Sequence, residues 1–110
     1  MTPDELNELS CMLIAYAGEA YAHFNKAIDL ASEGDFDASD REVSAGREAI
    51  ATAHKSQISL LQADATDGVS VMGVLAVHAQ DHLMNAMSFE NTAKRIVALY
   101  KRISAIESKG

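Results

Sequence analysis

The feature that most limits how this chain of 110 residues can fold is its shortage of helix-breaking residues. Its one proline is Pro3, and it has only six glycines. Alanine is abundant, tryptophan is absent, and residues that favour strands are few outside positions 69–77. A proline interrupts a helix because it lacks the backbone N–H and clashes with the preceding turn. We therefore expect an all-α protein with a single domain over residues 1–110.

Apolar residues that recur every three or four positions indicate three helices. The first is expected at about 3–33, with Thr2 as its N-cap and Gly34 as a left-handed terminator. The second is expected at about 37–63, followed by a loop over 64–68.

Asp35 and Asp37 are the two candidate caps of the second helix. The third helix is expected at about 70–108. Because the connections are short, the helices should form an antiparallel three-helix bundle.

Charge and cysteine content exclude several classes of protein. The formal net charge of −7 argues against nucleic acid and against anionic membrane surfaces as partners. The single cysteine, Cys11, cannot form an internal disulfide, and we expect it to be a small buried side chain. Since neither a signal peptide nor a membrane-spanning segment is visible, we expect a cytoplasmic protein.

The third predicted helix carries polar residues in the middle of its apolar stripe. His78, Asp81 and His82 are three and four residues apart, so they share one helix face. They occupy positions where the pattern predicts buried methyl groups. An unpaired buried carboxylate costs several kcal/mol, so this cluster requires a cation, a proton or hydrogen bonds.

Three chemistries are compatible with this cluster. Two histidines four residues apart with a carboxylate between them resemble a zinc site. Histidine and aspartate are also common acid–base catalysts. Third, a neutral imidazole such as that of His78 can attack phosphorus without a separate base. The spacing alone leaves all three open.

The run from Val77 to Met84, with the sequence VHAQDHLM, resembles the enzyme IIA component of the lactose/cellobiose branch of the bacterial sugar phosphotransferase system. Further similarities, in the family's order, cover nearly the whole chain: Gly34-Asp35-Phe36, Ala53-His54 with Gln57, and Leu99-Tyr100-Lys101. The sequence departs from the family at Gln62-Ala63-Asp64 and Ser88-Phe89-Glu90-Asn91.

The resemblance implies a phosphocarrier. His78 would accept a phosphoryl group from HPr, as a tele-phosphohistidine, and pass it to a cysteine of enzyme IIB during sugar uptake through enzyme IIC. Family members are homotrimers with nine helices, in which Asp81 from each of three subunits would hold a metal ion. Because the ligands would be oxygens, we expect Mg²⁺.

The resemblance leaves the supporting residues and the sugar less defined. Candidate hydrogen-bond donors to the phosphoryl group or to His78 are Gln80, His82, His54 and Gln57. Ala79 favours the cellobiose or chitobiose type over the lactose type. The alternative function is a helical metal-binding module, structural or regulatory, without phosphotransfer.

Overall fold

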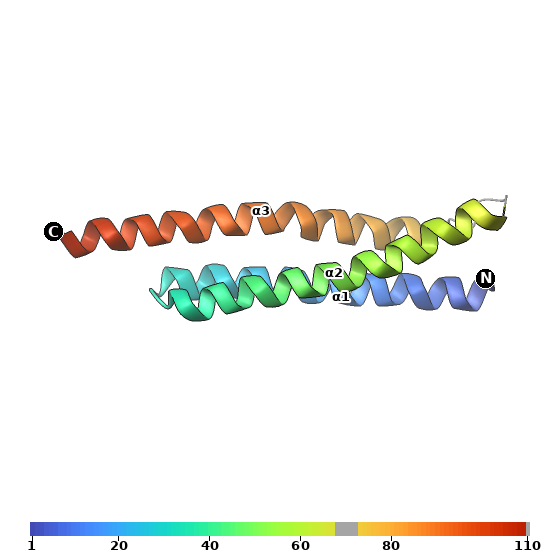
Figure 1. The fold of residues 1–110 in the computed structure, drawn as a ribbon, viewed down its shortest axis with the longest axis horizontal. Helices are drawn as coiled ribbons and strands as arrows, with labels where there is room; N and C mark the ends of the chain where they lie inside the picture. Colours follow the sequence, from blue (N-terminus) through green and yellow to red (C-terminus); the bar gives the residue numbers. More distant parts are fainter. Residues whose placement is uncertain (68–72, 110) are drawn as a thin grey trace.

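The computed structural model describes residues 1–67 and 73–109, which contain three α-helices. These are α1 (Pro3–Ser32), α2 (Phe36–Asp67) and α3 (Val74–Lys109). In Figure 1, α1 and α2 form an antiparallel hairpin, and α3 runs along it with its C-terminal end extending past the turn of the hairpin. The predicted all-α three-helix bundle is confirmed.

The ends of α1 and the start of α2 follow from local hydrogen bonds. The Oγ1 atom of Thr2 accepts a hydrogen bond from the backbone N–H of Glu5 at 3.2 Å. Gly34 has a φ of +87°, a left-handed conformation that a residue without Cβ adopts easily. The Oδ1 atom of Asp35 accepts from the N–H of Ala38 at 3.2 Å, so the first of the two predicted caps is used.

The end of α2 differs from the sequence prediction. The segment 64–67, predicted as part of a loop, continues the helix to Asp67. Polar residues cost a helix interior only a few tenths of a kcal/mol each, and the Thr66 hydroxyl donates to the carbonyl of Gln62 at 2.7 Å. Gly68, and the predicted start of the third helix near Ser70, lie outside the described residues.

The interior consists mainly of alanine methyl groups. The largest fully buried apolar side chains are Leu13, Phe24, Leu60 and Leu83. The other buried apolar residues are Ala17, Ala20, Ala27, Ala31, Ala49, Ala53, Ala76, Ala79, Ala86, Ala93 and Val97. Such small side chains allow the helix backbones to approach closely, which explains the absence of a broad apolar stripe on α2.

The predicted burial of Cys11 is wrong. Cys11 is exposed, because it lies two residues before the buried Leu13 and so on the opposite side of α1. On α2, Ile58 and Leu61 are 41% and 48% exposed, and Leu60 between them is buried.

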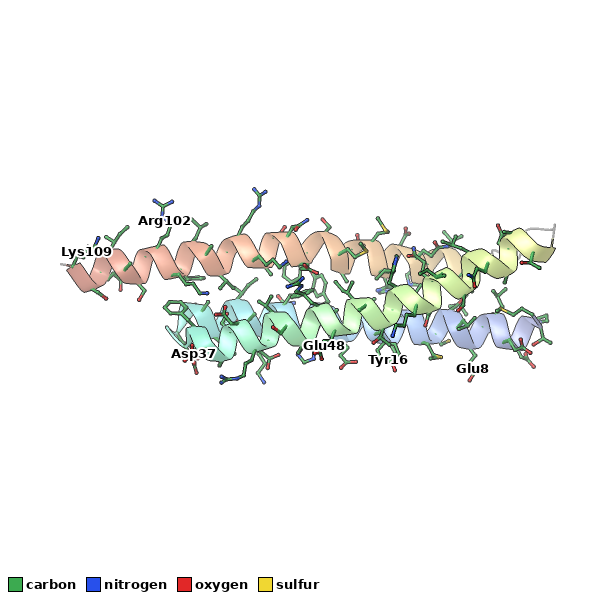
Figure 2. The ribbon with its side chains drawn as sticks, in the orientation of Figure 1. Glu8, Tyr16, Asp37, Glu48, Arg102 and Lys109 are labelled. Atoms are coloured by element: carbon green, nitrogen blue, oxygen red, sulfur yellow. The ribbon has the colours of Figure 1, made fainter. Side chains whose placement is uncertain are left out.

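The chain is long and narrow, with extents of 64 × 18 × 16 Å and a radius of gyration of 17.5 Å. A compact chain of this length would have a radius of gyration of about 13 Å. Large apolar residues such as Leu99 and Ile106 of α3 are exposed, and Figure 2 shows Arg102 pointing away from α1 and α2. None of the helices in the described part of the chain has the length and apolarity needed to cross a membrane.

A polar cluster connects α1 to α2 near the middle of the hairpin. His23 shares a hydrogen bond between its Nδ1 atom and Oε2 of Glu42. Lys26 Nζ lies 3.5 Å from the other oxygen of the same carboxylate. The hydrogen bond with His23, followed by the attraction of Lys26, lowers the pKa of Glu42 below its usual value despite the opposing effect of desolvation.

The lowered pKa of Glu42 predicts a pH-dependent contribution to stability. The ionised carboxylate stabilises the fold above the carboxyl's unfolded-state pKa of about 4.3, and this stabilisation disappears as the pH falls through the lower folded-state pKa. We expect Glu42→Gln to reduce the free energy of unfolding at pH 7 by up to about 1 kcal/mol, and to have little effect at about pH 3. Urea unfolding at both pH values measures this difference.

Glu48→Gln is the matched control, because Glu48 is an exposed glutamate of α2 without an ion pair among the described residues. An equal loss of stability at both pH values for Glu42→Gln would contradict the ionic explanation.

Candidate functional site

The candidate site lies near the N-terminal end of α3. His78 and His82 are one turn apart, and their Nε2 atoms are 3.1 Å from each other. Their ring centroids are 4.6 Å apart with an interplanar angle of 87°. The helical spacing of four residues therefore produces a direct contact between the two imidazoles, as the sequence predicted for residues on one face.

The surface around His78 is shallow and accessible. His78 is exposed, and together with Val77, Asp81 and Gly73 it lines a groove of about 410 Å³. Val74 completes this groove and is 88% exposed. An exposed imidazole surrounded by exposed valines can be reached by the surface of another protein, as phosphoryl exchange between proteins requires.

The predicted burial of Asp81 is wrong for the single chain. Asp81 is exposed, and it has no ion pair among the residues that the structure describes. The core side of α3 carries Leu83, which is two residues, or about 200° of helix rotation, from Asp81. The side of α3 that carries Asp81 is thus directed away from the hairpin.

Apolar side chains lie above and below Asp81 on this outward side. Leu99 is 18 residues from Asp81, which is five full helix turns, and Val74 and Ile106 lie within about 20° of the same direction. Their exposed fractions are 57% for Leu99, 88% for Val74 and 67% for Ile106. We call these four residues, together with Val77 and Met84, the outward face of α3.

Of the other candidate residues, Gln57 and Gln80 contact each other, whereas His54 lies apart from the histidine pair. Gln57 of α2 donates from Nε2 to Oε1 of Gln80 at 3.4 Å, which connects α2 to the turn of α3 that carries the histidines. His54 is exposed and makes no hydrogen bond or ion pair within the described ranges. The structure thus brings His82 to His78, pairs Gln80 with Gln57, and leaves His54 apart.

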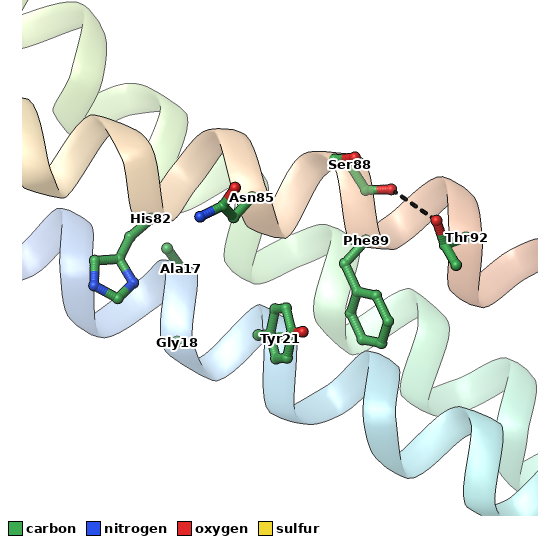
Figure 3. A pocket seen from close by; sticks show the side chains of 8 residues that line it. All are labelled: Ala17, Gly18, Tyr21, His82, Asn85, Ser88, Phe89 and Thr92. Carbon is green, nitrogen blue, oxygen red and sulfur yellow. Dashed lines mark hydrogen bonds between the residues drawn. The ribbon is translucent and has the colours of Figure 1, made fainter.

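A groove between α1 and α3 was missed by the sequence analysis. Its volume is about 580 Å³, and Figure 3 shows His82 and Tyr21 directed into it from the two helices. Tyr21 stacks on Phe89 with ring centroids 4.4 Å apart. Ser88 and Phe89, which line this groove, belong to the segment 88–91 where the sequence departs from the family.

The chain was compared with known proteins. A family model described as "PTS system, Lactose/Cellobiose specific IIA subunit" matches residues 8–101. The lactose-specific EIIA component of Staphylococcus epidermidis is 33% identical over 102 residues, covering 93% of this chain and 98% of the relative.

Two solved structures have the same fold. The cellobiose-specific enzyme IIA of Bacillus anthracis has a TM-score of 0.87 and 33% identity, covering 96% of this chain and 94% of that one. The chitobiose IIA in the IIA–HPr complex of Escherichia coli has a TM-score of 0.81 and 30% identity, covering 90% and 96%.

Proposed function

Because the chain belongs to the lactose/cellobiose-specific IIA family, whose members are phosphotransferase components of the sugar phosphotransferase system, we propose that His78 is its phosphoryl acceptor. The observation that carries this proposal is the exposed imidazole of His78, with its Nε2 atom 3.1 Å from Nε2 of His82. The phosphoryl group would be carried on Nε2 of His78, as a tele-phosphohistidine.

The proposed chemistry sets the tautomer of each histidine in this contact. Nε2 of His78 attacks phosphorus with its lone pair, so its proton must be on Nδ1. His82 is then the donor in the contact, with a proton on its own Nε2. In the transfer, the lone pair of His78 Nε2 forms the new N–P bond while the bond between phosphorus and the phosphoryl donor protein breaks. The N–H of His82 then loses its acceptor on His78 and can donate to a phosphoryl oxygen instead. His82 is therefore proposed as a positioning residue.

The partners follow from the family. The chitobiose IIA of Escherichia coli was solved in complex with HPr, and this supports HPr as the phosphoryl donor of the present chain. A cysteine of the cognate enzyme IIB is the proposed acceptor, and the exchange takes place in the cytoplasm. The sugar is proposed to be a β-linked disaccharide of the cellobiose or chitobiose type, which the likeness to the cellobiose-specific enzyme of Bacillus anthracis supports.

The test of the phosphocarrier function is direct phosphorylation. The protein is incubated with phosphoenolpyruvate, enzyme I and HPr, and its mass is measured. We expect a mass increase of one phosphoryl group that is lost in acid, as for a phosphohistidine. An unlabelled protein would reject phosphotransfer and favour the alternative function, a helical metal-binding module.

We further propose that the chain functions as a homotrimer, with nine helices, through the outward face of α3. Exposed Val74, Leu99 and Ile106 lie in line on this face, and burying such apolar area is the main driving force for association. Asp81 lies in the same line, so three copies would bring three carboxylates together.

Three adjacent carboxylates repel one another unless a cation or protons lie between them. In the described part of one chain, no group of three potential ligands is close enough to hold a metal ion. A set of three carboxylate ligands would therefore form only in the trimer, where Asp81 of each subunit would contribute an oxygen. Oxygen ligands favour a hard ion, so Mg²⁺ is proposed, and it would offset the negative charge that a phosphoryl group brings to this face.

Substitutions on the outward face test this assembly. Leu99→Asp is expected to raise the trimer dissociation constant by at least about a hundredfold, because it places three charges in an apolar contact. Asp81→Leu is expected to retain or strengthen the trimer and to abolish Mg²⁺ binding, since apolar replacement of clustered buried charges is often stabilising. Analytical ultracentrifugation and metal titration measure these effects.

Ala105→Asp is the control, because Ala105 is exposed on α3 and about a third of a turn from the line of Asp81 and Leu99. A wild-type protein that sediments as a monomer at micromolar concentration would contradict the trimer. Dissociation of Asp81→Leu would contradict the argument for charge repulsion.

A further inference from the structure

The contact between His78 and His82 has the dimensions of a metal chelate. Bonds from zinc to imidazole nitrogen are about 2.0–2.1 Å long. Two such bonds to nitrogens 3.1 Å apart enclose an angle of about 100° at the metal. This angle lies between the right angle of square-planar coordination and the tetrahedral angle, so the spacing suits Cu²⁺, Ni²⁺ and Zn²⁺.

We propose that His78 and His82 form a two-imidazole site for a divalent first-row transition metal. Both side chains come from the same helix, so the backbone of α3 holds the two residues one turn apart and only their side-chain rotamers must be ordered on binding. Both Nε2 atoms contact only each other among the described hydrogen bonds, and water can supply the remaining ligands because His78 is exposed.

The charge around the pair also favours a cation. The chain has a net charge of −7, and the carboxylate of Asp81, next to His82 in sequence, has no ion pair within the described ranges. The ligands differ from those proposed for Mg²⁺, because imidazole nitrogen suits transition metals whereas Mg²⁺ prefers oxygen. The two sites would therefore select different ions although they are adjacent on α3.

Metal binding at this pair would regulate phosphotransfer, a consequence that rests on the proposed function of His78. The lone pair of His78 Nε2 can form a bond to the metal or to phosphorus, and not to both. A bound transition metal therefore excludes the phosphoryl group, and a phosphorylated His78 excludes the metal. Metal binding also requires the proton on Nε2 of His82 to move through solvent to Nδ1, so that both Nε2 atoms present a lone pair. The proton returns to Nε2 when the metal leaves, and no change of redox state is involved.

Binding of Ni²⁺ to the full chain tests the site without any phosphotransfer. Calorimetric titration is expected to show binding that His82→Gln weakens on the order of tenfold or more. His54→Gln is the matched control and is expected to leave the affinity unchanged, because His54 is an exposed imidazole without a second imidazole in contact. Equal binding by the wild type and His82→Gln, or an equal loss in His54→Gln, would overturn the proposal.

A competition with Mg²⁺ separates this site from Asp81. Saturating Mg²⁺ is expected to leave Ni²⁺ binding in place, because the two ions use different donor atoms. Displacement of Ni²⁺ by Mg²⁺ would assign the binding to the carboxylates and overturn the histidine site.

Phosphorylation in the presence of Zn²⁺ tests the competition between metal and phosphoryl group. Transfer from isolated phosphorylated HPr is expected to be slowed by Zn²⁺ and restored by a chelator in the wild type, and to be much less sensitive to Zn²⁺ in His82→Gln. Equal sensitivity of both proteins would reject the competition. If the wild type accepts no phosphoryl group even without Zn²⁺, the proposed function fails while the Ni²⁺ result stands.

Discussion

His78→Gln is expected to accept no phosphoryl group from phosphorylated HPr, with a loss of at least about a thousandfold in the transfer rate. Glutamine retains hydrogen-bonding capacity at this position but has no nitrogen lone pair that can attack phosphorus. Because His78 is exposed, its replacement should change the free energy of unfolding by no more than about 0.5 kcal/mol. Mass spectrometry under non-acidic conditions measures the phosphoryl group, and circular dichroism measures the fold.

His23→Gln is the control for this experiment, since His23 connects α1 to α2 through Glu42 and lies outside the candidate site. This variant should be labelled as fully as the wild type at room temperature. If His78→Gln is phosphorylated to the same extent as the wild type, another residue is the acceptor and the proposed mechanism is wrong.

Gly46→Ala is expected to destabilise the protein, although alanine normally favours a helix over glycine. A Cβ atom at Gly46 would lie 2.5 Å from Cε1 and 2.8 Å from Cζ of Phe24, which is fully buried between the helices. The phenyl ring cannot move without displacing the alanines packed around it. Overpacking of this kind costs about 1–3 kcal/mol, which exceeds the gain of about 1 kcal/mol from replacing a helical glycine.

Gly18→Ala provides the opposite result in the same protein. Gly18 is an exposed glycine within α1, and nothing lies within 4 Å of a Cβ atom placed there. This variant should be more stable than the wild type by about 0.5–1 kcal/mol. Urea unfolding compares the two variants, and a stabilised Gly46→Ala would contradict the close approach of α1 and α2.

The sequence predicted the helices well because their signals are local. Proline at the first helical position, the Thr2 cap and Gly34 define the ends of α1, and each depends only on neighbouring residues. The stop at residue 63 was wrong because Asp and Thr at 64–67 resemble a loop in composition, although a helix tolerates them at small cost.

The packing of the helices was harder to predict, for a physical reason. Apolar periodicity is clearest for large side chains, whereas most residues in the core of this bundle are alanines, with only a few large side chains such as Leu13 and Phe24 and several buried serines. Large apolar residues such as Leu99 and Ile106 instead lie on the outward face of α3. The apolar periodicity of the third helix therefore combined core residues such as Ala93 with residues that its own hairpin does not cover.

The candidate site was identified as a cluster because residues three and four apart on a helix must be neighbours. The distance of 3.1 Å between His78 and His82 could not be read from the spacing, since it depends on the rotamers of both side chains. The groove at Tyr21 and Phe89 depends on how α1 and α3 lie against each other, which no local pattern reports.

The placement of Asp81 and Leu83 on opposite sides of α3 has a consequence for how such proteins diverge. Buried residues that stabilise the fold alternate along α3 with exposed residues that can contact other molecules. A mutation at an exposed position therefore changes the packing of the buried residues very little. A descendant can acquire a new recognition surface through changes at exposed positions while retaining its alanine interior. One scaffold can thus serve transporters for different sugars at little cost in foldability.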